Sequence, residues 1–458
     1  MSRDIKDLIM HGEEVVSPKV QTPDITVTVD RKTERQTLQK MDVLLVPVTC
    51  MIYLLSFLDR ANMGNARVAG LQTQLKLTDH QYQLVLTVTY IPYIVAEIPS
   101  NLVLKKVGPR LMIPGGFYRR HELQTRISFF FSAAALSGAF SGLLAAGIVR
   151  MDGLGGMEGW RWIFCIEGII TVVFGAASFF LLPNTPSQLL GFKEQHVKCC
   201  EARLLLDAGT GIPESTSFDL RKSVSAFTSL HIWLVTLSQF CGGTCLFGLA
   251  YFTPSIVASL VASFPSKPSL VEIQLLTVPP FVIAFAFAMA AAYVSDRYRR
   301  RGLTAICMIS IAIIGWILFL TASLKNVGQR YTSLILVIVG IYSTAPSLIS
   351  WIPNNVSTHM RRATAIAMSF MATNVGGIIS SWIYPRSSAP QYHFAAKFNL
   401  ALTCLNVSFM VAEVLLLRHL NSRKIEKREE LLKDVAHLTP HEQYERLGDT
   451  HPDFKYTL

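Results

Sequence analysis

The chain has 458 residues, of which 51% are hydrophobic and only 16% are charged. The apolar residues fall into runs of about twenty, the length of helix that crosses ~30 Å of hydrocarbon, and a soluble domain could not bury so many such helices. The formal net charge of +11 does not indicate nucleic-acid binding, because most Lys and Arg residues stand in short segments between apolar runs. In that position they orient a membrane protein.

Motifs for enzymatic or metal chemistry are missing from the sequence. The eight cysteines are dispersed without a CxxC pair, so neither a disulfide framework nor a zinc site is expected. The sequence contains no GxxxxGK[ST], HExxH or nucleophile elbow. We therefore expect an all-α membrane protein that is not an enzyme and holds no metal or cofactor.

Hydropathy predicts ten membrane-spanning helices, so both termini should lie on one side of the membrane. The segments on that side carry 17 Lys and Arg residues and those on the other side carry nine, which places both termini in the cytoplasm. The predicted spans are residues 43–66, 82–104, 125–148, 162–182, 231–254, 272–294, 303–323, 331–352, 363–384 and 397–418.

Polar segments divide these spans into two bundles. Residues 1–42 form a polar tail, and 43–183 form an N-terminal bundle of four spans. A central cytoplasmic loop, 184–230, leads to a C-terminal bundle of six spans, 231–420. Residues 421–458 form a charged cytoplasmic tail, which we predict to be a solvated flank of the last span.

The two halves of the chain match each other only in their leading parts. From the first span of each half to the glycine of a basic turn, Gly108 or Gly302, there are 65 and 71 residues. From these glycines to residues 182 and 420, at the ends of the two halves, there are 74 and 118 residues, and the difference of 44 is about the length of two spans. We predict that the first half lacks a helical hairpin, with residues 111–119 as a cytoplasmic bridge. A ten-span design with unequal halves is the alternative.

Two ionisable residues lie in the first span, where charge is costly and therefore informative. Arg60 suits a carboxylate ligand, because its planar guanidinium makes two parallel hydrogen bonds and stays charged. Asp59 suits proton coupling, because its protonation responds to burial and to nearby charge. Asn62 continues the polar face as a candidate substrate contact. The alternative is an interfacial ion pair that ends the helix.

Glu97 and Glu167 are further carboxylates within predicted spans. Glu97 is a candidate for proton coupling, although it is close enough to the cytoplasmic end to pair with loop lysines instead. Glu167 follows two tryptophans typical of the membrane interface. A structural role for Glu167 is favoured, in which it holds Arg161 or a helix end.

A basic turn follows the span at 272–294. Asp296 and Arg297 are predicted to form an ion pair and helix cap that opens and closes as the halves move, with Arg301 and Gly302 completing this gating turn. A solvated loop would have the same kind of sequence and is the alternative to a gating turn. Tyr342 and Asn374 offer polar side chains to a central cavity, although helix packing explains each of them as well.

Several ordered motifs resemble one known family. They are FLDRANMGNAR, YIPYIVAEIPSNLVLKKVGPR, WRWIFCIEG followed by LLPNTPSQ, AAYVSDRYRRRG and HMRRATAIAMSFMATNVGGIISSWIY. Together they resemble the fungal anion:cation symporters of the major facilitator superfamily, a group that includes allantoate, nicotinate and other vitamin permeases. The resemblance implies a monomeric plasma-membrane protein with twelve helices in two bundles, which imports a small organic anion together with protons by alternating access.

By position, the resemblance makes Asp59 the protonation site, Arg60 the anion contact, and Asp296 with Arg297 part of the gating turn. The chain departs from the family between GPRLMIPG and FYRRHELQTR, where family members carry their third and fourth helices. The alternative to a working carrier is therefore a non-transporting product of splicing or gene modelling, or a ligand-sensing pseudocarrier.

Overall fold

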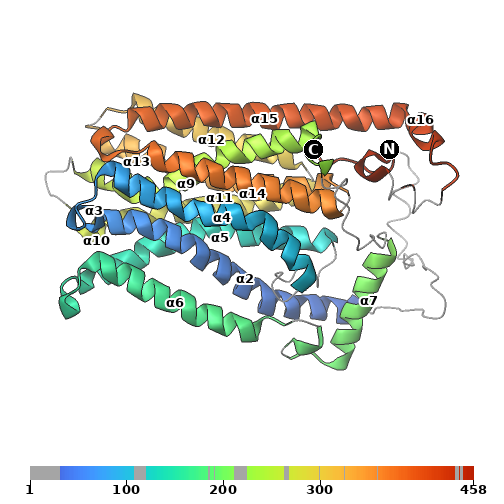
Figure 1. The fold of residues 1–458 in the computed structure, drawn as a ribbon, viewed down its shortest axis with the longest axis horizontal. Helices are drawn as coiled ribbons and strands as arrows, with labels where there is room; N and C mark the ends of the chain where they lie inside the picture. The colour runs from blue at the N-terminus through green and yellow to red at the C-terminus, as the bar shows by residue number, and fades with distance from the viewer. Residues whose placement is uncertain are drawn as a thin grey trace, which may run out of the picture.

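The computed structural model describes residues 31–107, 120–183, 186–189, 191–210, 224–262, 268–298, 300–323, 325–357, 359–438, 443 and 447–458. Its long helices run side by side along one direction (Figure 1). The first described helix begins, and the C-terminal segment packs, at the end that we call the terminal face. The opposite end, where short connections join the helices, is called the loop face.

Among the described residues, four long helices belong to the first half and six, one of them interrupted, to the second half. The helices of the first half are α2 (Arg31–Val68), α3 (Leu71–Gln74), α4 (Asp79–Val107), α5 (Arg120–Ile148) and α6 (Gly159–Leu181), followed by α7 (Glu194–Thr210). Those of the second half are α9 (Leu230–Val261), α10 (Leu270–Leu276), α11 (Val278–Tyr298), α12 (Arg301–Thr321), α13 (Val327–Asn355), α14 (His359–Trp382), α15 (His393–Glu426) and α16 (Arg428–Lys433). Single 3₁₀ turns occur at Val149–Met151, Leu154–Gly156, Pro186–Gln188, Arg386–Ser388 and Gly448–Thr450.

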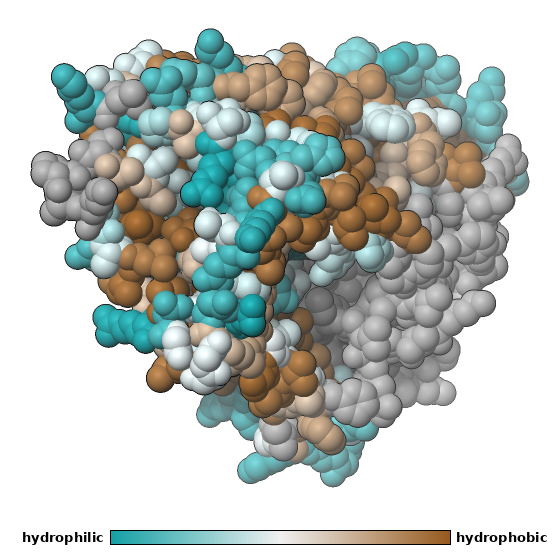
Figure 2. All heavy atoms as spheres, turned by 60° about the vertical axis from the view of Figure 1, so that its left-hand side comes forward, coloured by the Kyte–Doolittle hydropathy of each residue, from teal (hydrophilic) through white to brown (hydrophobic). Residues whose placement is uncertain are grey.

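Within the described residues, nine helices are long and apolar enough to cross a membrane. They correspond to nine of the ten predicted spans, with α10 and α11 together making one. The tenth span, 82–104, lies in α4, whose side chains are described only as far as Val95, so the count of four plus six stays a prediction. The predicted bridge at 111–119 lies outside the described residues. On the face shown in Figure 2, hydrophilic patches alternate with hydrophobic ones.

The described part of the central loop contains a helix that the sequence analysis did not predict. In the central loop, α7 lies across the terminal face (Figure 1). Arg203 of α7 is 1% exposed and pairs with Glu34 of α2 at 3.0 Å, and Cys200 packs into an apolar cluster with Met41 and Leu45. These contacts stabilise the polar first part of α2, which begins at Arg31, twelve residues before the predicted span begins at residue 43.

Glycines allow the two halves to approach each other closely. A Cβ atom on Gly64 of α2 would lie 2.2 Å from the carbonyl oxygen of Tyr251 on α9. A Cβ atom on Gly377 of α14 would lie 2.4 Å from the Tyr90 ring of α4. Small residues at such positions are what brings membrane helices into contact, so the halves depend on these glycines for their packing.

An ionic cluster around Asp79 joins the halves at the loop face. The Asp79 carboxylate lies 3.3 Å from Arg67 and accepts hydrogen bonds from the Gln72 side chain at 2.8 Å and from the backbone N–H of Arg386, in the second half, at 2.8 Å. Burial raises the pKa of Asp79, but the Gln72 hydrogen bond, the Arg67 charge and the backbone donors outweigh it, so the pKa is lowered overall. The cluster therefore holds the halves together through an ionised carboxylate.

Two further hydrogen bonds connect the halves toward the same face. The Gln274 side chain donates to the carbonyl of Asn65 at 3.4 Å, and the Trp382 indole donates to the Thr87 hydroxyl at 3.0 Å. With the Asp79 cluster, these bonds close the loop face between the halves.

The C-terminal segment Gly448–Leu458, which we call the tail segment, packs under the second half at the terminal face. Asn355 at the end of α13 exchanges three hydrogen bonds with Thr457, at 2.8, 3.0 and 3.0 Å. Lys424 of α15 donates to the carbonyl of Phe454 at 2.8 Å, and Arg361 of α14 pairs with Asp449. The prediction of a solvated flank is thus wrong for this segment, because buried side chains of the second half bind its backbone.

Candidate substrate cavity

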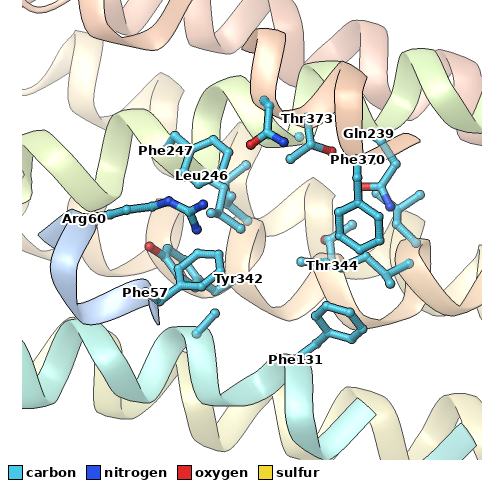
Figure 3. Close-up of a pocket in the computed structure, with 18 of the residues that line it drawn as sticks. Phe57, Arg60, Phe131, Gln239, Leu246, Phe247, Tyr342, Thr344, Phe370 and Thr373 are labelled. Atoms are coloured by element: carbon cyan, nitrogen blue, oxygen red, sulfur yellow. The ribbon is translucent and has the colours of Figure 1, made fainter. Parts of the chain in front are cut away.

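A cavity of about 190 Å³ lies between the two halves. Helices α2, α4 and α5 line it on one side, and α9, α12, α13, α14 and α15 line it on the other. Its walls combine aromatic rings with a few polar groups, and Figure 3 shows Phe131 and Phe370 at the end remote from Arg60. This is the usual character of a small-molecule site.

Arg60 is the only described lining residue that carries a charge at neutral pH. Its side chain reaches from α2 into the cavity (Figure 3). The guanidinium carbon lies 4.8, 5.2 and 5.0 Å from the ring centres of Phe57, Tyr93 and Phe247. Within the described part of the chain Arg60 forms no ion pair, so aromatic faces stabilise the cation and leave its donors free for an anion.

Polar groups on the second half complete the cavity wall. Tyr342 and Asn374, both predicted as substrate contacts, line it. Asn406 of α15 lines it too, although the sequence analysis missed it. Its amide oxygen accepts a hydrogen bond from Ser238, while its amide nitrogen has no partner among the described residues. A buried donor without a partner is costly, so the Asn406 amide is a further candidate ligand. The only signal for Asn406 in the sequence is that it is a polar residue within the predicted span 397–418.

The other two predicted site residues of α2, Asn62 and Asp59, lie away from the cavity. Asn62 is 1% exposed and accepts a hydrogen bond from the Ser141 hydroxyl of α5 at 3.1 Å, so it joins helices. Asp59 is exposed on the surface of α2 and does not line the cavity. Successive residues of a helix point ~100° apart. Asp59, one residue before Arg60, and Asn62, two residues after it, therefore point in other directions than Arg60, which faces the cavity. The side chain of Glu97, on α4, lies outside the described part.

The predicted gating turn lies at the terminal face between α11 and α12. Arg297, in the last turn of α11, is exposed, and the side chain of Asp296 lies outside the described part, so their ion pair stays a prediction. Arg301 is 4% exposed and donates to the Ser350 carbonyl at 2.9 Å. A Cβ atom on Gly302 would lie 2.8 Å from the Trp351 ring, so this glycine serves close packing.

Glu167 of α6 does not hold Arg161, which corrects the expectation from the sequence. Arg161 pairs with Glu158 at 2.6 Å. Glu167 is 1% exposed, and neither of its carboxyl oxygens has a hydrogen-bond partner among the described residues. The arginine and Glu158 are three residues apart and share a helix face, whereas six residues separate Arg161 from Glu167 and turn them away from each other.

Two helical halves around a central cavity, closed at one face, define a multi-pass secondary transporter. The Major Facilitator Superfamily model matches residues 115–381. An uncharacterized transporter of Schizosaccharomyces pombe is 33% identical over 438 residues, covering 86% of each chain. The chain therefore belongs to the Major Facilitator Superfamily, whose members are transport proteins and not enzymes.

Two other similar proteins extend this comparison. The high-affinity nicotinic acid transporter of Saccharomyces cerevisiae is 28% identical over 472 residues, which cover 92% of this chain and 85% of that one. The crystal structure of a bacterial homolog of the human lysosomal transporter Spinster matches with a TM-score of 0.52 at 11% identity, over 84% of this chain and 98% of that one. The latter similarity shows the fold alone.

Proposed function

We propose that this protein imports a small organic anion together with protons. The observation that carries the proposal is Arg60, a cation among aromatic rings in a cavity where no other described residue is charged. An arginine fork binds a carboxylate with two parallel hydrogen bonds, and the rings offer stacking surfaces to an apolar or planar body. A vitamin carboxylate or an allantoate-like nitrogen compound fits this chemistry.

The substrate class also draws support from a relative. The Saccharomyces cerevisiae relative transports nicotinic acid, according to its name, and nicotinate combines a planar ring with a carboxylate. Asn406, Asn374 and Tyr342 line the same cavity as Arg60 but belong to the other half, and there they would bind polar atoms of the substrate. Nicotinate is therefore our first test compound.

The proposed orientation in the membrane rests on the charge at the two faces. We propose that the terminal face is cytoplasmic, because the segments assigned to it carry 17 Lys and Arg residues against nine on the other side. The loop face, closed by the Asp79 cluster, is then the outer face, and the described conformation is closed to the outside. We place the carrier in the plasma membrane as a monomer, with Asp59 as the group that couples uptake to protons.

Uptake assays test this function directly. Full-length protein in proteoliposomes should accumulate labelled nicotinate when the outside is made acidic, and Asp59→Asn should abolish the pH dependence. Arg161→Gln, which removes an exposed arginine of α6 far from the cavity lining, serves as the control and should behave like the wild type. Uptake that ignores pH and survives Asp59→Asn would refute the coupling assignment.

A second candidate function rests on the predicted missing hairpin. The Schizosaccharomyces pombe alignment spans 438 positions but includes 86% of the 458 residues here, which is about 394, so about 44 positions face no residue of this chain. The same arithmetic with 472 positions and 92% leaves about 51 for the nicotinic acid transporter. Both values match the length of two spans, which supports a shortened, non-transporting product or a ligand-sensing pseudocarrier.

The exposed position of Asp59 on a predicted span bears on this alternative, because a charge within a span is costly where it faces lipid and a lost helix would have covered it. The genomic sequence and transcripts across the codons for Gly115–Phe117 separate the two readings. A hidden reading frame of about two spans in length would indicate a modelling error. An uninterrupted exon would establish a shortened protein, and its nicotinate uptake then decides between carrier and sensor.

A further inference from the structure

Glu167 is buried in a setting that does not suit an ionised carboxylate. It lies on α6 where this helix packs against α2 and α5, and both oxygens are buried without a partner among the described residues. Nearby apolar clusters contain Leu58 and Ala133 on one side and Ile163 with Ile166 on the other. Burying an unpaired ionised carboxylate costs several kcal/mol, so such a group takes up a proton instead.

The charged residues around Glu167 offer no compensation. On α6 itself, Arg161 is engaged with Glu158. The 3₁₀ turn that packs on α6 carries Arg150, which is exposed. On α5, Arg126 pairs with Asp42 toward the terminal face. Arg60 of α2 points into the cavity instead (Figure 3), and no described cation forms an ion pair with the Glu167 carboxylate.

The described group that interacts with Glu167 through its charge carries the same sign. Asp59 of α2 lies within electrostatic range of Glu167, and unlike Glu167 it is exposed. Two carboxyls that interact through their charges disfavour each other's ionisation and titrate as a pair when the interaction is strong. The exposed Asp59 can exchange protons with its surroundings, whereas Glu167 can retain one.

We propose that Glu167 is a proton-binding residue of this carrier and that it shares one proton with Asp59. The inference rests on the proposed function, because it takes protons as the driving ion. It adds a second carboxyl group, on α6, to the coupling site predicted on α2.

The pair also connects to the substrate cavity. Arg60 follows Asp59 in the chain and interacts with it electrostatically, while its guanidinium points into the cavity. A substrate anion bound to Arg60 offsets the positive charge that favours the ionised form of Asp59. Anion binding therefore promotes proton uptake by the carboxyl pair, and each ligand favours binding of the other, as symport requires.

Infrared difference spectroscopy tests the site without any substrate. The full chain in lipid bilayers is titrated with alkali, and the carbonyl band of protonated carboxyls is followed. We expect a band that Glu167→Gln removes, that Glu167→Asp restores, and that Asp59→Asn shifts to lower pH by about one unit or more, since pairs of this kind interact by at least that much.

Glu413→Gln is the matched control. Glu413 is equally buried, at 1% exposure, but is hydrogen-bonded to His231 at 2.8 Å, so its loss should leave the Glu167 band and the Asp59-dependent shift in place. A band that is unchanged in Glu167→Gln overturns the proposal. So does an Asp59→Asn variant whose band titrates as in the wild type.

Nicotinate uptake supplies a second readout. We expect the dependence of uptake on an imposed pH gradient to disappear in Glu167→Gln, and a pH profile identical to that of the wild type overturns the proposal. If the wild type accumulates no nicotinate under any gradient, the proposed function fails. The infrared band then still decides whether Glu167 binds a proton.

Discussion

Replacing Arg60 tests how the cavity binds an anion. Lysine at this position keeps the positive charge but loses the planar fork and its stacking on the rings of Phe57, Tyr93 and Phe247. The loss of one charge-assisted hydrogen bond costs about 1.5–3 kcal/mol, and each 1.4 kcal/mol is tenfold in affinity. We therefore expect Arg60→Lys to raise the half-saturating nicotinate concentration roughly 10- to 100-fold, and Arg60→Gln, which also lacks the charge, to raise it further.

The assay is competition by unlabelled nicotinate and by nicotinamide, its uncharged analogue, in proteoliposomes. If Arg60 binds the carboxylate, the preference for nicotinate over nicotinamide should collapse in Arg60→Gln, while Arg161→Gln keeps it. Equal preference in the wild type, or an unchanged preference in Arg60→Gln, would refute the assignment of Arg60 to the anion. Melting temperatures should stay near that of the wild type, since no described ion pair depends on Arg60.

Three further predictions concern the contacts between the halves and the packing of the tail segment. The pKa of Asp79 is lowered on folding. The contribution of the Asp79 carboxylate to the stability of the fold is therefore present above the ordinary pKa of about 3.9 and is lost as the pH falls through the lowered pKa. Asp79→Asn should remove this acid-sensitive contribution from melting temperatures measured as a function of pH. Asn355→Ala breaks three hydrogen bonds of ~0.5–1.5 kcal/mol each and should lower the melting temperature. Ser422→Ala, at an exposed position, is the control and should not. Equal melting temperatures of the two variants would contradict the packing of the tail segment. Gly377→Leu should stop uptake by separating the halves, while Gly175→Leu, where a Cβ meets nothing within 4 Å, should not; equal uptake by both variants would show that close approach at Gly377 is dispensable.

The helices could be predicted well from the sequence because a bilayer leaves the backbone few choices. Apolar runs must be helical where no water can satisfy the peptide groups. The predicted spans are helical in the structure except for one or two residues at the ends of three spans and Thr277 between α10 and α11. Polar extensions were harder to predict. The start of α2 at Arg31 depends on Arg203 and Cys200 in α7, a long-range contact that local hydropathy does not contain.

Individual site residues were predictable only where chemistry and helix geometry agreed. An arginine within a span almost had to face a polar cavity, and Arg60 does. The order of side chains around the helix separates it from Asn62, which instead binds Ser141. The isolation of Glu167 needed the structure, because it depends on which residues α2 and α5 bring to α6.

The tail segment has a consequence for the biosynthesis of this protein. Residues 448–457 leave the ribosome after every described membrane helix, yet they bind α13, α14 and α15 at their terminal-face ends. Until they emerge, the buried Asn355 and Lys424 lack these backbone partners, so the second half can insert into the membrane before it reaches its final packing. A chain that ends before Gly448 would therefore contain all of its described membrane helices but lack the contacts that complete the packing of its second half.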